Sequence, residues 1–216
     1  MSIFEQLSNN NGTVSSALGK VLAQKVVQES QMDILMECID LASYEPSSPA
    51  SRHIRSGAAK VVEIVAEKLP ELVAPHLSKL FPALSVQEPQ TRWAIIRVMG
   101  FCARLNTLAA QAAIAYAEKY IENKEGLCVA SSTDLFLGDL GAISQENAQK
   151  VFPLLEQSME SPIENEQDWL LEALCKLFQN LDQAGKAEVL KFAERWQYSS
   201  RKSTQQRARR ILGLRD

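Results

Sequence analysis

The stretch RWAIIRVMGFCARL, from Arg92 to Leu105, indicates the fold class of this 216-residue chain. Its apolar residues recur at three- and four-residue spacing, as they do on the buried face of an α-helix. They are Ile95, Ile96, Val98, Met99 and Cys102. The opposite face carries Trp93, Arg97 and Arg104. The pattern predicts an amphipathic helix, and we interpret it as the second helix of a two-helix unit.

Helices of this kind recur along the chain at an almost constant interval. Aligned helix positions lie 37 or 38 residues apart, at Arg55, Arg92, Ala130, Asp168 and Gln205. One aligned column is apolar throughout and holds Val61, Val98, Phe136, Leu174 and Ile211. The next column holds Val62, Met99, Leu137, Cys175 and Leu212, and a third contains Gly100, Gly138 and Gly213. A glycine inside a helix costs about 1 kcal/mol relative to alanine, so we expect close packing at these glycines.

The segments between these helices are themselves amphipathic and are predicted to be their partner helices. They span Glu71 to Leu84, Leu108 to Ile121, Glu146 to Glu160 and Gly185 to Tyr198. The links are short and polar, which makes consecutive helices antiparallel neighbours. Before them the sequence predicts helices over Ser2–Ser8, over Thr13–Val27 with Thr13 as N-cap, and over Gln31–Ala42. A loop rich in proline and serine follows, from Ser43 to Ser51.

Helix pairs with a proline in the first helix, such as Pro75 and Pro153, resemble the HEAT-repeat family, with the armadillo family a close second. The resemblance covers roughly Glu71 to Asp216 well and the first seventy residues loosely. It departs from the family pattern at Asp168 and Gln205, where an arginine is typical. It implies an all-α, right-handed α-α superhelix (solenoid) of about five to six helix pairs. We expect one domain over residues 1–216, in which residues 1–50 form divergent N-terminal cap helices and residues 51–216 form regular repeats.

Composition narrows the classes of protein that fit. The hydrophobic fraction of 46% allows a continuous core, and no apolar run is long enough to span a membrane. No signal peptide is visible. Four cysteines without a C-x-x-C pair are expected to be small buried hydrophobes in a reducing compartment, which points to a cytoplasmic protein without metal or cofactor.

The charge is spread unevenly along the chain. The net charge is −3, yet the segment from Arg195 to Asp216 carries seven basic residues against one acidic residue, a net +6. The C-terminal basic helix, with Arg207, Arg209 and Arg210, has two interpretations. It is either an ordinary polar cap on the last repeat or a binding site for an acidic partner.

In a helical stack of this kind the second helices would line a concave face. Their outward ridges would present Trp93, Arg97 and Arg104, then Trp169 and Lys176, with Asp134 between the two tryptophans. Exposed tryptophans are common anchors in protein interfaces, although each ring would alternatively be buried across the neighbouring helix. The function we predict is a non-catalytic scaffold that binds another protein or peptide on this face. The oligomeric state does not follow from the sequence.

A competing class is a DNA-binding or DNA-repair enzyme. HEAT-like alkylpurine DNA glycosylases place an aspartate between tryptophans on the concave face, and Asp134 is the nearest match here. The local motif departs from that family because no tryptophan precedes Asp134 on its own helix. The acidic body of the chain also disfavours contacts with phosphate. No phosphate-binding loop, zinc-binding motif or catalytic triad is visible otherwise.

Overall fold

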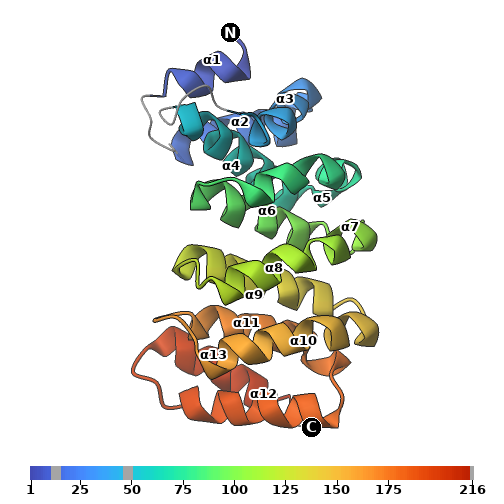
Figure 1. The fold of residues 1–216 in the computed structure, drawn as a ribbon, viewed down its shortest axis with the longest axis vertical. Coiled ribbons are helices and arrows are strands. Elements are labelled where there is room, and N and C mark those ends of the chain that lie inside the picture. The colour runs from blue at the N-terminus through green and yellow to red at the C-terminus, as the bar shows by residue number, and fades with distance from the viewer. Residues whose placement is uncertain (11–15, 46–50, 215–216) are drawn as a thin grey trace. The chain divides into compact units, whose positions relative to one another are not determined.

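The computed structural model describes residues 1–10, 16–45 and 51–214, and every regular element in these ranges is a helix (Figure 1). None of the described helices is long and apolar enough to cross a lipid bilayer. Contacts within the chain define two units, Met1–Ala113 and Ile114–Asp216. Each unit is described by itself below. The expected all-helical class is confirmed, whereas the single repeat domain stays a prediction.

The first unit is built around its longest helix, α4. Its helices are α1 (Ile3–Ser8), α2 (Ser16–Glu29), α3 (Met32–Ala42), α4 (Arg52–Lys68), α5 (Pro70–Val73), α6 (Pro89–Phe101) and α7 (Thr107–Ala112), with the 3₁₀-helix η2 (Ala74–Ser85). Helix α4 packs against α2, α3 and α6. Ser2 caps α1 with a reciprocal capping box that includes Glu5. The proposed N-cap Thr13 and residues 46–50 of the predicted loop lie outside the described residues.

The second unit is built in the same way around α11. It contains α8 (Ile114–Glu122), α9 (Leu127–Gly141), α10 (Gln145–Glu160), α11 (Gln167–Leu177), α12 (Gln183–Trp196) and α13 (Lys202–Leu212), with the short 3₁₀-helix η3 (Phe178–Asn180). Helix α11 lies between α9 and α13 and contacts both of them (Figure 1). The second helices of three successive predicted repeats therefore form one layer.

Two predicted partner helices differ from the sequence pattern. The segment expected as one α-helix over Glu71 to Leu84 forms only one α-helical turn and continues as 3₁₀-helix. Pro75 and Pro82 lack an N–H group, so each removes one hydrogen bond from an α-helical ladder and disfavours its continuation, although α10 continues through Pro153. The helix expected over Leu108 to Ile121 is interrupted at Ala113, which separates α7 from α8.

The repeat register is confirmed by burial. All five side chains of the first apolar column are fully buried: Val61, Val98, Phe136, Leu174 and Ile211. In the second column Val62, Met99 and Leu137 are fully buried, while Cys175 and Leu212 are half-buried. The alignment at intervals of 37 or 38 residues therefore identifies positions that face the core in both units.

The glycine column has different roles at different repeats. At Gly138 the prediction of close packing is confirmed, because a Cβ atom there would lie 2.6 Å from the Ala173 Cα on α11. At Gly213 the prediction is wrong. Gly213 is the exposed C-cap residue of α13, where an added Cβ would meet no atom closer than 3.6 Å.

The cysteines also divide into two groups. Cys38 and Cys102 are fully buried, as expected, and burial raises the pKa of each thiol to about 12. The expectation is wrong for Cys128, which is exposed near the start of α9, and for Cys175, which is half-buried.

Equivalent helix junctions in the two units carry ion pairs of opposite polarity. Between α4 and α6, Arg55 Nη2 donates to Glu88 Oε2 at 2.7 Å, and Thr91 donates to Glu88 Oε1 at 2.9 Å. Between α11 and α13, Arg201 Nη2 donates to Asp168 Oδ2 at 3.2 Å, and Thr204 donates to Asp168 Oδ1.

The partners in each of these ion pairs are 33 residues apart, and Arg55 and Asp168 are aligned positions in the repeat. Both junctions thus contain an ion pair at the same two aligned positions. The base comes first in the chain between α4 and α6, and the acid comes first between α11 and α13.

Candidate functional site

The surface of α11 and α13 carries the exposed aromatic residue that the sequence analysis singled out. Trp169 is 36% exposed, so most of the residue is covered, as in the alternative of a largely buried ring, while part of it stays accessible. The guanidinium carbon of Arg207 lies 5.8 Å from the centre of the Trp169 ring. This cation–π contact fixes an accessible tryptophan against a charged neighbour.

Ion pairs join α9, α11 and α13 across the same surface. Glu172 accepts from Arg207 Nε at 3.3 Å and pairs with Arg210 Nη2 at 2.9 Å. Lys176 Nζ donates to Asp139 Oδ1 at 2.6 Å. We call this surface the Trp169 face and define it by Asp139, Trp169, Glu172, Lys176, Arg207 and Arg210.

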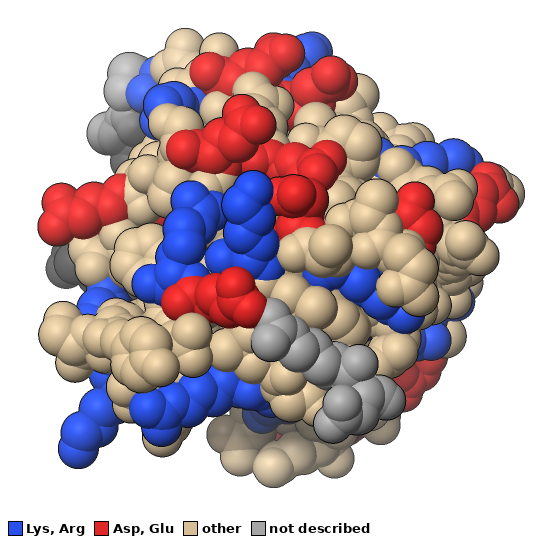
Figure 2. Space-filling view, turned by 90° about the horizontal axis from the view of Figure 1, so that it is seen from below, with Lys and Arg blue, Asp and Glu red and all other residues tan. Residues whose placement is uncertain are grey.

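The Trp169 face is nearly balanced in charge. Glu172 neutralises part of the charge of two arginines, and its hydrogen bond raises the pKa of Arg210. Arg201 is likewise held by Asp168. Figure 2, which views the end where α12 and α13 lie in Figure 1, shows acidic and basic side chains next to one another. Two acids of α11, Asp168 and Glu172, thus pair with Arg201, Arg207 and Arg210 of the basic C-terminal segment, while Arg209 is exposed.

The three predicted residues on α6 and just after it differ in exposure. Arg97 was expected on an outward ridge, but it is only 8% exposed, with its guanidinium 4.2 Å from the centre of the Phe101 ring. Trp93 is half-buried and Arg104 is exposed. A groove that joins Trp93 to Trp169 would extend from the first unit to the second, and it stays a prediction.

Asp134 is a core residue and not a surface residue. Its side chain is fully buried within unit 2, which corrects the expectation that it stands beside the tryptophans on the outer ridge. Desolvation by burial, followed by the nearby charge of Glu166, raises the pKa of Asp134 well above its usual range. A carboxyl that is fully buried cannot serve as the exposed acid on which the DNA-glycosylase alternative rested.

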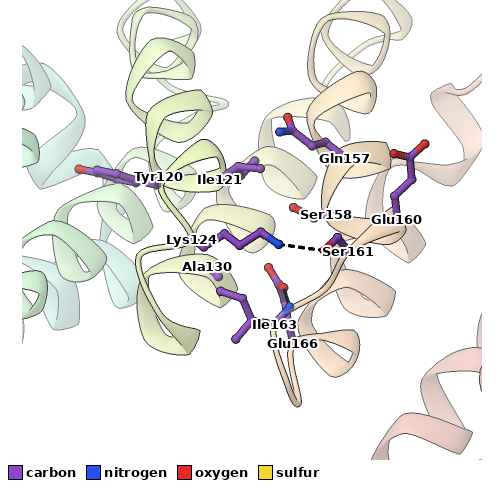
Figure 3. A pocket seen from close by; sticks show the side chains of 10 residues that line it. All are labelled: Tyr120, Ile121, Lys124, Ala130, Gln157, Ser158, Glu160, Ser161, Ile163 and Glu166. Atoms are coloured by element: carbon purple, nitrogen blue, oxygen red, sulfur yellow. Dashed lines mark hydrogen bonds between the residues drawn. The ribbon is translucent and has the colours of Figure 1, made fainter.

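A small pocket lies over this buried acid. It measures about 150 Å³ and is lined, among others, by Tyr120, Ile121, Lys124, Ala130, Ser158 and Glu166 (Figure 3). All lining residues belong to the second unit. Lys124 Nζ donates to Ser161 Oγ at 2.9 Å across the opening. Glu166, only 3% exposed, accepts a hydrogen bond from the backbone N–H of Ile163.

Sequence reasoning missed Glu166 because it lies in the acidic segment ESPIENE, from Glu160 to Glu166, and acidic runs of this kind are ordinarily solvated loops. A signal was nevertheless present in the repeat alignment. Ala130 occupies the position held by Arg55 and by Asp168 in the other two junctions. A small residue at a position that otherwise carries a charged side chain leaves space, and the position 33 residues later, which holds the ion-pair partner in the other two junctions, is the apolar Ile163.

Comparisons with known proteins bear on the fold only. No protein-family model and no curated protein matches the chain. Two solved structures of engineered proteins from the Northeast Structural Genomics Consortium are similar to it. One is 12% identical with a TM-score of 0.55, over 90% of this chain and 95% of that chain. The other is 13% identical with a TM-score of 0.57, over 97% of this chain and 62% of that chain.

Proposed function

We propose that the chain is a HEAT-like α-α superhelical scaffold that binds another protein or peptide and has no catalytic activity of its own. The observation that carries this proposal is the exposed Trp169, held in place by Arg207 on a face built from three adjacent second helices. A large aromatic ring that is accessible yet ordered can bury apolar area on binding at little entropic cost. The surrounding ion pairs supply a polar rim.

The charge balance of the Trp169 face favours a protein partner over nucleic acid. Binding to a phosphate backbone gains affinity from several cations that are free to contact phosphates. On this face Lys176, Arg207 and Arg210 are each paired with a carboxylate. A partner of mixed charge, with an apolar side chain to cover Trp169, complements the surface better than a polyanion does.

A photo-crosslinking experiment tests the proposal. A photoreactive phenylalanine analogue placed at Trp169 should capture a specific protein in cells, and Trp169→Ala should abolish copurification of that protein. The same analogue at Tyr198, which is 81% exposed, is the matched control for a merely accessible aromatic position. Equal capture at both positions, or undiminished copurification with Trp169→Ala, would show that the Trp169 face is not a binding surface.

A further inference from the structure

A groove of about 460 Å³ lies between α2 and α4, within the first unit. Each wall is one face of a helix, because the lining residues of both helices follow one another at intervals of four, three and one residues. The row on α2 consists of Lys20, Gln24, Val27 and Gln28. The row on α4 consists of Lys60, Ile64, Glu67 and Lys68. Most of these side chains are exposed, so the groove opens to solvent.

The two rows run in the same direction along the groove. Gly19, next to Lys20, lies against the start of the α4 row, because a Cβ atom added there would be 3.5 Å from Lys60 Cγ and 4.0 Å from Ile64 Cδ1. The last residue of each row lines the same groove. Lys20 and Lys68 therefore lie at opposite ends of it, separated by about 12 Å of helix axis.

Basic residues outnumber acidic residues in the groove, with three lysines against one glutamate. Lys60 Nζ donates to Glu63 Oε2 at 2.7 Å on its own helix, whereas Lys20 and Lys68 form no ion pair with any residue that the structure describes. In the second unit, ion pairs cross from α9 to α11 and from α11 to α13. None joins α2 to α4 in the described part of the chain, so a cation at each end of the groove is available to an outside partner.

The middle of the groove offers apolar surface and hydrogen-bonding groups. Val27 and Ile64 are half-buried, so part of each branched side chain stays accessible. Gln24 Nε2 donates to Gln28 Oε1 at 2.7 Å. This bond leaves the Gln24 oxygen as an acceptor and the Gln28 nitrogen as a donor for a peptide backbone. A helix uses its backbone groups internally, so these amides favour an extended segment.

An extended peptide fits the spacing of these groups. Its side chains alternate between two faces at about 3.3 Å per residue, so positions i, i+2 and i+4 point the same way and span about 13 Å. Acids at i and i+4 would reach Lys20 and Lys68, while an apolar side chain at i+2 would cover the middle of the groove. A nucleic-acid strand fits less well, because Glu67 repels phosphates and the apolar middle gives them no contact.

We propose that this groove, the α2–α4 groove, binds an extended acidic segment of a partner protein with the pattern acid-x-apolar-x-acid. Lys20 and Lys68 are the counter-ions of its two carboxylates. The inference goes beyond the proposed function, because the groove belongs to the first unit and the Trp169 face belongs to the second. Failure of one test therefore leaves the other proposal standing.

The test is an NMR titration of the full chain with a synthetic peptide, acetyl-Ser-Glu-Ser-Leu-Ser-Glu-Ser-amide, at low salt. The side-chain amide signals of Gln24 and Gln28 should shift, and the affinity should fall as salt is added. A peptide with glutamine in place of both glutamates should bind at least about tenfold more weakly. A peptide of the same composition with adjacent glutamates should also bind more weakly. Equal binding of the adjacent-acid peptide, or no shift at about 1 mM of the first peptide, would overturn the proposal.

A short oligothymidylate distinguishes a peptide groove from a nucleic-acid groove. It should bind more weakly than the acidic peptide, because the groove holds only two unpaired lysines and one opposing acid. Tighter binding of the oligonucleotide, with the same amide shifts, would assign the groove to nucleic acid and overturn the proposal.

Four variants test the assignment of residues. Lys20→Gln and Lys68→Gln should each weaken the acidic peptide several-fold and leave the glutamine peptide unaffected. Glu67→Gln should tighten the acidic peptide, since it removes a like charge from the wall of the groove. Lys25→Gln is the matched control, because it removes the same charge from α2 at a position that does not line the groove, and it should change the affinity by less than about twofold.

The control also fixes the outcomes that contradict the proposal. A loss for Lys25→Gln equal to the loss for Lys20→Gln would assign the attraction to the general charge of α2 and overturn the role of the groove. Weaker binding of the acidic peptide by Glu67→Gln would mean that the groove does not select an acid. Circular dichroism on each variant separates lost binding from lost folding, and a gain of affinity by Glu67→Gln cannot arise from unfolding.

Discussion

At the scale of single residues, Gly138 shows why the interior of a helix can contain glycine, which disfavours helix formation. Helix propensity alone favours alanine over glycine by about 1 kcal/mol. At Gly138, however, any Cβ would overlap the backbone of α11, at 2.6 Å from the Ala173 Cα and 2.9 Å from its carbonyl oxygen. Backbone atoms cannot rotate away as a flexible side chain can, so the glycine is required by the distance between α9 and α11.

A glycine-to-alanine change inside a helix usually stabilises a protein, but we expect Gly138→Ala to destabilise this one. It should lower the free energy of unfolding by about 1–3 kcal/mol, and Gly138→Leu should lower it more. Urea denaturation followed by circular dichroism measures the change. Gly213→Ala is the matched control, because a Cβ there is at least 3.6 Å from any neighbour, and it should change stability by less than about 0.5 kcal/mol. A stabilising Gly138→Ala would mean that the two helices are farther apart than described.

The ionisation of the Asp134 carboxyl should make the stability of the fold depend on pH. Its pKa in the folded state is raised above the ordinary aspartate value of 3.8, so the folded protein binds the proton more tightly than the unfolded chain does. This contribution to stability is fully present below pH 3.8. It is lost as the pH rises through the folded-state pKa.

We expect Asp134→Asn to gain stability relative to wild type as the pH rises from 4 to 8, by about 1–3 kcal/mol at the upper end. Urea denaturation at a series of pH values gives the difference curve. Glu164→Gln, which removes an exposed acid of the same loop as Glu166, should follow the wild-type curve. A difference between Asp134→Asn and wild type that does not vary with pH would mean that Asp134 is not protonated in the folded state.

At the scale of helices and their junctions, the repeat alignment predicts which positions meet but not which residues fill them. The apolar columns follow from helical spacing, so their burial was predictable from Val61 to Ile211. The 3₁₀ geometry of η2 was missed because the apolar spacing of Leu77, Leu80 and Leu84 fits an α-helix, and a proline does not by itself predict 3₁₀ geometry, since α10 continues through Pro153. The opposite polarity of the two ion pairs, and their replacement by Ala130, depend on contacts between helices that one sequence does not show.

The junction of α11 and α13 should depend more on the hydrogen bonds of Asp168 than on its charge. Asp168 accepts from Ser203 and from the fully buried hydroxyl of Thr204, whereas its cationic partner Arg201 is half-exposed. Solvent screens such a cation, and the buried hydroxyl loses its acceptor if the carboxyl is removed.

We therefore expect Asp168→Ala to lower the free energy of unfolding by about 2–3 kcal/mol, and Asp168→Asn, which keeps an acceptor for Thr204, by less. Arg201→Gln should cost below about 1 kcal/mol. Thermal and urea denaturation of the three variants establish the order. If Arg201→Gln proved as costly as Asp168→Ala, the ion pair and not the buried hydrogen bond would hold the junction.

At the scale of the whole molecule, part of the basic charge at the C-terminal end of the sequence is paired with acids of a neighbouring helix. The net +6 of the last 22 residues appears in the sequence as a free basic segment. In the fold, α13 lies beside α11, and the acids Asp168 and Glu172 stand opposite Arg201, Arg207 and Arg210. This pairing was unpredictable from the charge count, because it depends on which helix covers α13. Trp169 could be named from its helical position, but its exposure and its contact with Arg207 could not.

Because Glu172 pairs with Arg207 and Arg210, the arginines of α13 should contribute differently to the stability of the fold. Arg207→Gln with Arg210→Gln removes both partners of Glu172 and should lower the free energy of unfolding by about 0.5–1 kcal/mol, since the groups are partly solvated and screened. The loss should shrink in 1 M salt, where the Debye length is about 3 Å. Arg209→Gln removes the same charge from an exposed position of the same helix and should have no measurable effect on stability. Equal losses for Arg209→Gln and the double variant would mean that the charge of α13 acts through the general field of the molecule and not through Glu172.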